Sequence, residues 1–237
     1  SALIDLINDV QLYYTKADIS SAAAFRSDMN LKKGDFKKKD VAFIYKYSNT
    51  LMGVNMTGEN LLKYMEWSAS YYNTAKKGDV TISFNPNVRS YNYDMFEGID
   101  YDIDISQKAG SRIKNVKIKG QSIDPKKVYK VAVNNYRFGT LQSLKLATPQ
   151  DVYFDSYETM QDAGRIRALI GKYVKDVDKG VISPKVNNNW KIIGFDPDVE
   201  GRDKILDEIR AGTIKIPASA DGRTPNVKSI NIYELNN

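Results

Sequence analysis

Apolar residues recur at three- and four-residue spacing at several places in the chain, and this spacing predicts amphipathic helices. The first fifteen residues carry it, and so does a segment that starts after Thr57, whose hydroxyl is expected to cap the helix. Residues 166–177 show the spacing again, and a shorter helix is predicted for Asp203 to Ala211. Helices are therefore predicted in the first and the last third of the chain, and the middle is β-rich.

Alternation of apolar and polar residues, with many β-branched and aromatic side chains, predicts strands in the remaining segments. The predicted strands are Val41 to Tyr47, Leu51 to Met56, 99–105, 116–118 and 129–133. Ser20 to Ala24 has only small residues and is predicted to be a loop. Because helices and strands do not alternate regularly and a hairpin lies in the middle, we expect an α+β fold rather than a doubly wound parallel sheet.

The pattern changes after Trp190, where Asp196-Pro197 opens a segment with one short helix and a stretch containing Pro, Gly and Ser. The chain has 237 residues, which fits one large domain with an added segment. We therefore expect residues 1–195 to form one domain and residues 196–237 to be an appended segment or linker.

The composition excludes several kinds of chemistry. The chain has no His and no Cys, which excludes thiol nucleophiles, Ser–His–Asp triads and zinc sites built from His or Cys. Its net charge is +6, but the lysines are dispersed, so we interpret them as a solvated surface and expect no nucleic-acid polymer as a partner.

No stretch reaches the roughly 18 apolar residues of a membrane helix, so no membrane span is expected. Asp5 and Asp9 interrupt the first apolar run, so it is not a signal peptide. Any export signal is expected to lie before residue 1.

Several short motifs follow one another in a specific order. They are Ser21-Ala-Ala-Ala-Phe-Arg26, Tyr45-Lys-Tyr-Ser-Asn-Thr50, Asn55-Met-Thr-Gly-Glu59, the strand that starts at Phe96-Glu-Gly, and Val133-Asn-Asn-Tyr-Arg-Phe-Gly139. Together they resemble the C-terminal domain of the 5′-nucleotidase family, most of all its 2′,3′-cyclic-nucleotide 2′-phosphodiesterase/3′-nucleotidase branch. The resemblance covers roughly residues 1–195; each motif alone is weak evidence, but the ordered set is fairly specific.

This resemblance implies a fold of two β-sheets between helical layers and a division of labour between two domains. In the family, a separate N-terminal metallophosphoesterase domain holds two divalent metal ions and performs the hydrolysis. The C-terminal domain binds the nucleotide. The resemblance thus implies that this chain holds no metal, cofactor or catalytic residue and is inactive alone. Its partners would be a nucleotide or nucleoside substrate and the N-terminal domain of the same protein, a bacterial hydrolase of nucleotide catabolism that is secreted, periplasmic or bound to the cell wall.

The family's binding residues carry over to five positions. Tyr47 and Tyr136 match the two aromatic residues that stack on the base, and Asn49 and Asn135 match polar residues beside it. Arg26 matches an arginine that contacts the substrate phosphate, a role that suits a guanidinium with two parallel donors. We expect the two tyrosine rings to face each other about 7 Å apart, which is twice a stacking distance.

Two departures from the family weaken parts of this assignment. Ser21 and the alanines after it replace Asn and glycines, which leaves Arg26 open to the alternative of a surface salt bridge. Phe138-Gly139-Thr140-Leu141 stands where the family has a Gly-Gly loop that meets the ribose. Two alternatives stay open. The two tyrosines are ordinary members of a chain that has sixteen of them, or the chain is a non-enzymatic interaction module of the cell surface on the same fold, whose basic surface binds a wall polymer or another protein.

Two acidic patterns are candidates for cation sites. Asp100, Asp102 and Asp104 share one face of a predicted strand, and a solvated face is the better interpretation. The segment Asp196 to Asp207 has partial Ca²⁺-loop spacing, although Lys204 stands where a ligand is needed. We keep Ca²⁺ binding there as a minority hypothesis.

Overall fold

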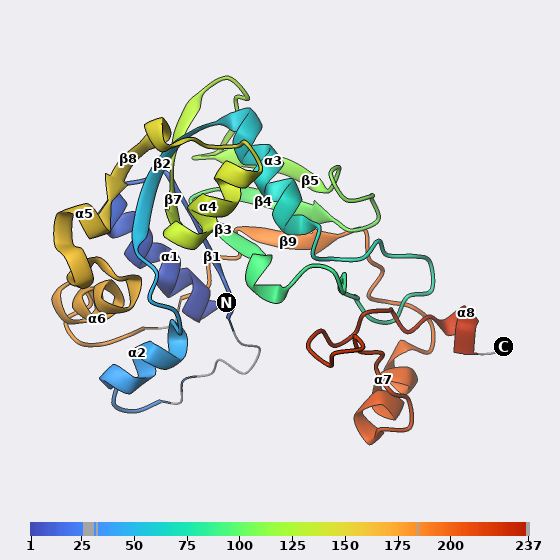
Figure 1. Cartoon of the computed structure of the whole chain (residues 1–237). Coiled ribbons are helices and arrows are strands. Elements are labelled where there is room, and N and C mark those ends of the chain that lie inside the picture. The colour runs from blue at the N-terminus through green and yellow to red at the C-terminus, as the bar shows by residue number, and fades with distance from the viewer. Residues whose placement is uncertain (26–30, 32, 184, 236–237) are drawn as a thin grey trace. The chain divides into compact units, whose positions relative to one another are not determined.

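The computed structural model describes residues 1–25, 31, 33–183 and 185–235 (Figure 1). The chain divides into two compact units. The first comprises Ser1–Tyr64, Asp94–Asp100 and Lys117–Asn189, and the second comprises Met65–Tyr93, Tyr101–Val116 and Trp190–Asn237.

A five-stranded mixed sheet of order β3-β1-β7-β2-β8 forms the centre of the first unit. Its strands are β1 (Ile19–Ala23), β2 (Leu51–Thr57), β3 (Asp94–Glu97), β7 (Val128–Asn134) and β8 (Val152–Asp155). Strand β1 pairs with β7 in parallel, and the other pairs are antiparallel. The longest register joins β2 to β7, from Leu51 opposite Asn134 to Thr57 opposite Val128. The start of β2 and the end of β7 therefore share one edge.

Helices cover both faces of this sheet. They are α1 (Ala2–Thr15), α2 (Lys38–Ile44), α3 (Gly58–Ala69, whose last residues fall in the second unit), α4 (Asn135–Ser143), α5 (Ser156–Met160) and α6 (Ile166–Asp176). Neighbouring side chains of a strand point to opposite faces. Ser20 of β1 bonds to Asn8 and Gln11 of α1, and Ser21 bonds to Tyr64 of α3. Helices α1 and α3 thus lie on opposite faces of β1, which is buried along its whole length.

A four-stranded sheet of order β6-β5-β4-β9 falls mostly in the second unit. Its strands are β4 (Asp100–Asp104), β5 (Ile113–Ile118), β6 (Gln121–Ser122) and β9 (Trp190–Ile193), and the unit also contains α7 (Arg202–Ala211) and α8 (Ile232–Leu235). Buried Arg112 donates hydrogen bonds to the carbonyls of Ala69, Tyr72 and Gln107. These bonds satisfy a charged group that would otherwise be costly to bury.

The α+β prediction is confirmed, and so are the helices at the N-terminus, after Thr57 and at 166–177. Thr57 Oγ1 accepts from the Asn60 N–H at 3.3 Å, as expected of a cap. Two predictions are wrong. Most of Val41 to Tyr47 belongs to helix α2, and Ser20 to Ala24 is mostly strand β1.

The boundary at residue 195 stays a prediction. Among the residues that the structure describes, no helix has the length and apolar character needed to span a bilayer.

Candidate functional site

The segments that carry Tyr47 and Tyr136 meet at one edge of the five-stranded sheet. Leu51 and Asn134 are opposite each other there, and hydrogen bonds continue the pairing one residue further. The Thr50 N–H donates to Asn135 Oδ1 at 3.1 Å, and the Asn135 N–H donates to the Thr50 carbonyl at 3.0 Å. Segments about eighty-five residues apart in sequence are thereby joined. The pairing of β2 with β7 therefore brings together the segments that carry Tyr47, Asn49, Asn135 and Tyr136.

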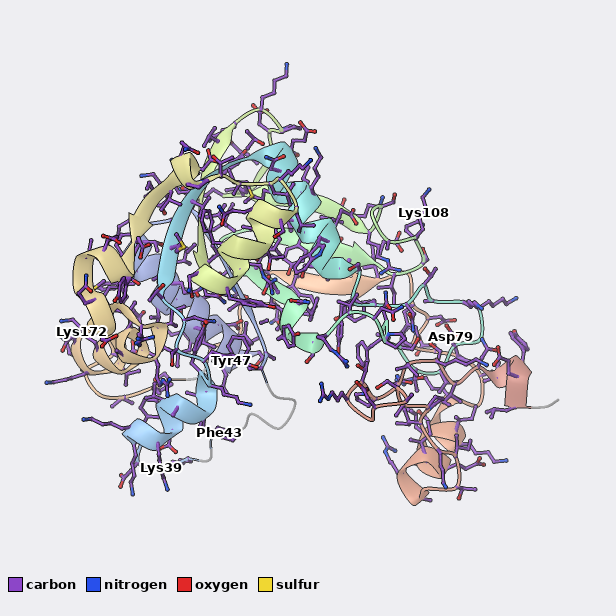
Figure 2. All side chains as sticks on the ribbon, viewed as in Figure 1. Lys39, Phe43, Tyr47, Asp79, Lys108 and Lys172 are labelled. Atoms are coloured by element: carbon purple, nitrogen blue, oxygen red, sulfur yellow. The ribbon has the colours of Figure 1, made fainter. Side chains whose placement is uncertain are left out.

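Tyr47 lies three residues beyond helix α2 and is 40% exposed (Figure 2). Its ring meets the ring of Phe25 edge to face, with centroids 5.0 Å apart and planes at 86°. Phe25 makes a second edge contact, at 4.9 Å, with buried Tyr45. Phe25 follows strand β1, so a third segment of the chain reaches the same edge. Tyr47 is therefore a surface ring with an aromatic support.

Tyr136 lies in the first turn of helix α4 and is 55% exposed. Asn134 caps this helix, because its Oδ1 accepts from the Arg137 N–H at 2.7 Å. The exposure of Tyr47 and Tyr136 argues against the interpretation that they are core residues, since core tyrosines such as Tyr45 and Tyr64 are 1% and 0% exposed. That the two rings face each other across a base-sized gap stays a prediction.

The two asparagines are held by the protein itself. Asn49 Nδ2 donates to Tyr45 Oη at 3.4 Å, and the backbone carbonyl of Asn49 accepts from the Ile166 N–H at 2.9 Å. Burial raises the pKa of Tyr45, and hydrogen bonds with Asn49 and Asn134 offset this only in part, so Tyr45 stays neutral. Asn135 Oδ1 accepts the hydrogen bond from the Thr50 N–H at the sheet edge. Any contact of Asn49 or Asn135 with a base thus starts from fixed positions.

The remaining sequence features are placed differently. Arg26 lies outside the described residues. Gly139 lies inside helix α4 with open space around the position of a Cβ atom, so no glycine-dependent close approach exists there. Residues 138–141, which stand in place of the family's ribose loop, belong to this helix, and it continues to Ser143.

The acidic strand face has protein partners: Asp102 accepts from Asn115, and Asp104 accepts from Ser106. Within the described ranges, no three carboxylates gather in a way that could hold a metal ion, around Asp196 or elsewhere.

Three further residues at this edge, Phe25, Asp94 and Arg137, have no role that the sequence indicates. Phe25 and Arg137 lie inside two of the ordered motifs. Asp94, the first residue of β3, forms a buried ion pair with Arg137: Oδ2 and Nε are 2.5 Å apart, and each side chain is 3% exposed. No local pattern signals this pair, because its members are 43 residues apart.

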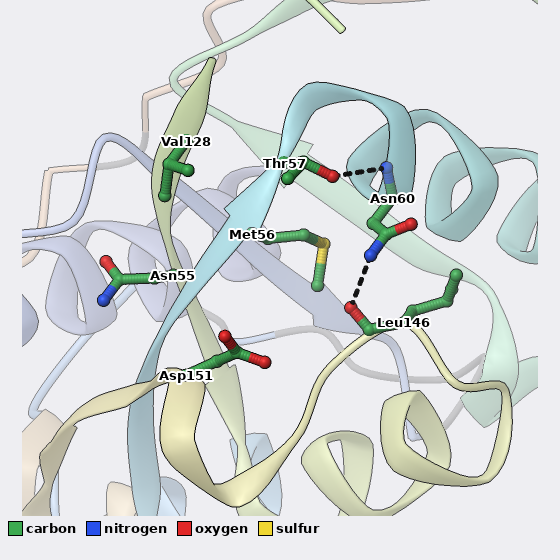
Figure 3. A pocket seen from close by; sticks show the side chains of 7 residues that line it. All are labelled: Asn55, Met56, Thr57, Asn60, Val128, Leu146 and Asp151. Atoms are coloured by element: carbon green, nitrogen blue, oxygen red, sulfur yellow. Dashed lines mark hydrogen bonds between the residues drawn. The ribbon is translucent and has the colours of Figure 1, made fainter. Parts of the chain in front are cut away.

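A pocket of about 430 Å³ lies at the other end of β2 (Figure 3). Its lining residues are Asn55, Met56, Thr57, Asn60, Val128, Leu146 and Asp151. Two of the lining residues are joined by a hydrogen bond: Asn60 Nδ2 donates to the Leu146 carbonyl at 3.1 Å. Four residues of β2, Leu51 to Val54, lie between the pocket lining and Thr50 at the tyrosine edge, at about 3.3 Å each. The pocket and the tyrosines are therefore distinct features.

Comparison with known proteins gives one family. Residues 1–145 match the profile of the 5′-nucleotidase C-terminal domain. A 2′,3′-cyclic-nucleotide 2′-phosphodiesterase/3′-nucleotidase of Yersinia enterocolitica is 28% identical over 80% of this chain and 34% of its own length. A protein of the same name from Salmonella typhimurium is 30% identical over 73% of this chain and 30% of its own length. The chain thus spans about a third of these relatives.

The solved structure of a 5′-nucleotidase precursor from Thermus thermophilus has the same fold. Its TM-score is 0.64 at 20% identity, covering 83% of this chain and 36% of that one. The NAD nucleotidase of Haemophilus influenzae gives a TM-score of 0.62 at 16% identity, covering 81% of this chain and 33% of that one. These likenesses agree with the α+β architecture.

Proposed function

Because this chain belongs to the 5′-nucleotidase family and matches the C-terminal domain of that family, we propose that it is the nucleotide-binding part of a 2′,3′-cyclic-nucleotide 2′-phosphodiesterase or nucleotidase. In this proposal Tyr47 and Tyr136 stack on the base, and Asn49 and Asn135 meet its edge. Arg26 contacts the phosphate. Hydrolysis belongs to a separate N-terminal metallophosphoesterase domain of a secreted bacterial protein.

One observation carries this proposal: two exposed tyrosines lie on segments that the β2–β7 pairing brings to a single sheet edge. Exposed aromatic rings are suited to stacking, since every base has a π-face and each stack contributes about 1–3 kcal/mol. The amides beside the rings can both donate to and accept from a base edge. Such a site binds and positions a nucleotide, which lowers the entropic cost of a reaction performed elsewhere.

Metal chemistry is not assigned to this chain. It has no His or Cys, and its described part has no cluster of three possible ligands, so its residues do not fit the pair of metal ions used in the family. We therefore derive no hydrolytic step from these residues. The proposed role is binding and orientation.

The experiment that tests this proposal measures binding of adenosine, adenosine 3′-phosphate and 2′,3′-cyclic AMP by calorimetry. The Tyr47→Ala and Tyr136→Ala variants should each weaken binding by about 1–3 kcal/mol, or roughly 5- to 150-fold in Kd, with little loss of stability. Tyr13→Ala is a matched control, because Tyr13 is a 43% exposed tyrosine on α1. Absence of binding by the unmodified chain, or equal loss in the control, contradicts the proposal.

A further inference from the structure

The ion pair between Asp94 and Arg137 is an unusual feature of the first unit because both charges are buried. Removing two charges from water costs several kcal/mol per ion, and a buried pair is often no more stabilising than apolar residues of the same size. Burial raises the pKa of Asp94, and attraction to Arg137 with the hydrogen bond from Tyr64 offsets this only in part. Net stability is therefore a poor explanation for the pair.

Its position suggests another explanation. Arg137 is the neighbour of Tyr136 in the first turn of α4, and its guanidinium carbon lies 6.0 Å from the centre of the Tyr136 ring. This is within the range in which a cation is attracted to an aromatic face. Asp94 holds the same guanidinium, with Oδ2 2.5 Å from Nε and Oδ1 3.4 Å from Nη2. One buried guanidinium thus connects the core to an exposed ring.

Asp94 itself is fixed by three elements. Its backbone pairs with Ala23 of β1, and its Oδ2 accepts from Tyr64 Oη of α3 at 2.6 Å. Tyr64 Oη in turn lies 2.7 Å from Ser21 Oγ. All these side chains are buried, so the position of the Arg137 guanidinium is set by β1, β3 and α3 together. A planar guanidinium held at several nitrogens has little freedom to rotate.

We propose that Asp94 and Arg137 are positioning residues that hold the Tyr136 ring in the orientation required for stacking on a base. This inference rests on the proposed function and extends it to two buried residues that do not touch the ligand. An exposed tyrosine without support populates several χ1 rotamers, and fixing one of them has an entropic cost at binding. The buried pair fixes the ring before the nucleoside arrives.

The test is a comparison of nucleoside affinity and thermal stability in three variants. Asp94→Leu/Arg137→Met replaces both charges by apolar groups, so no unpaired charge remains in the core. Arg137→Lys keeps a charge opposite Asp94 but loses the planar fork. Ser20→Ala is the matched control: it removes buried hydrogen bonds from β1, the strand next to Asp94, but on the face covered by α1.

We expect the double variant and Arg137→Lys to remain folded and to raise the Kd for adenosine at least fivefold. The decrease in adenine absorbance that accompanies stacking of the bound base should also be smaller in these two variants than in the unmodified chain. Ser20→Ala should lower the midpoint of thermal unfolding but leave the Kd unchanged at temperatures where it is folded. If the double variant does not fold, Arg137→Lys alone decides the question.

A folded double variant, or Arg137→Lys, that binds adenosine as the unmodified chain does would overturn this inference. The pair would then be structural only. The proposed function would survive that result if Tyr136→Ala still lost binding. If the unmodified chain binds no nucleoside, the proposed function itself fails, and this inference fails with it.

Discussion

Removal of the Asp94 carboxylate alone is predicted to destabilise the protein severely. In Asp94→Ala the Arg137 guanidinium, whose side chain is only 3% exposed, loses its ion-pair partner and gains little water in its place. Breaking a buried pair in this way costs about 3–5 kcal/mol. The Tyr64 hydroxyl also loses the acceptor to which it donates at 2.6 Å, which adds about 1 kcal/mol. The expected loss is therefore about 4–6 kcal/mol.

This loss is a large share of the 5–15 kcal/mol that stabilises a typical domain. For a chain of this size, about 1 kcal/mol shifts the midpoint of thermal unfolding by about 2–4 °C, so a decrease of roughly 10–20 °C is expected. Urea unfolding followed by circular dichroism measures the free energy, and Asp94→Leu/Arg137→Met is the comparison because it removes both charges. A loss below about 1 kcal/mol in Asp94→Ala would refute the reasoning, because it would show that the variant does not leave Arg137 as a buried charge without its ion-pair partner.

Three further predictions follow from the same structure. Phe25→Ala should weaken adenosine binding by about 0.5–1.5 kcal/mol, because Tyr47 loses its edge-to-face support; an unchanged Kd in calorimetry would show that the contact is incidental. The free energy of unfolding should fall as pH rises above about 10. Burial raises the pKa of Tyr72 to about 12, so the unfolded chain releases this proton at a lower pH than the folded chain does. The stability that is present below pH 10 is therefore lost as the pH rises toward 12. Each pKa unit corresponds to about 1.4 kcal/mol, and pH 11.5 still lies below the raised pKa, so Tyr72→Phe should remove about 2 kcal/mol of this dependence between pH 9 and 11.5 in urea titrations. An equal dependence in the variant contradicts the assignment. The chain alone should release no product from 2′,3′-cyclic AMP with Mn²⁺, and measurable turnover by chromatography would disprove that expectation.

The two errors in the predicted elements have identifiable physical causes. Val41 to Tyr47 has the β-branched and aromatic residues of a strand, but Val41 and Ile44 are spaced for a helix face and are both buried. Asp40 Oδ2 accepts from the Lys37 N–H at 2.7 Å and starts that helix. Tertiary packing thus overrode a weak strand propensity. A single sequence does not show which of the two patterns prevails.

Strand β1 was missed for a different reason. Its central residues are serines and alanines, which give no hydrophobic alternation. Small side chains fit there because helices cover both faces, with Gln11 approaching from α1 and Tyr64 from α3. These partners are distant in sequence, so no local pattern indicates a buried strand.

The candidate site also has one part that the sequence indicates and one part that it does not. Ordered motifs resembling a known family indicated Tyr47 and Tyr136, and the structure places them on joined segments. The supporting residues could not be predicted, because the contact of Asp94 with Arg137 depends on the long-range pairing of β3 with β1. Exposed candidate residues within motifs were therefore accessible from the sequence, whereas the buried residues behind them were not.

A crystal structure of the chain with bound adenosine tests the central claim most directly. The account predicts the adenine between the rings of Tyr47 and Tyr136, with the two ring planes about 7 Å apart and the Asn49 amide at the base edge. Adenosine bound elsewhere, such as in the pocket lined by Asn55 and Asp151, or tyrosine rings that do not contact the base, would contradict the account.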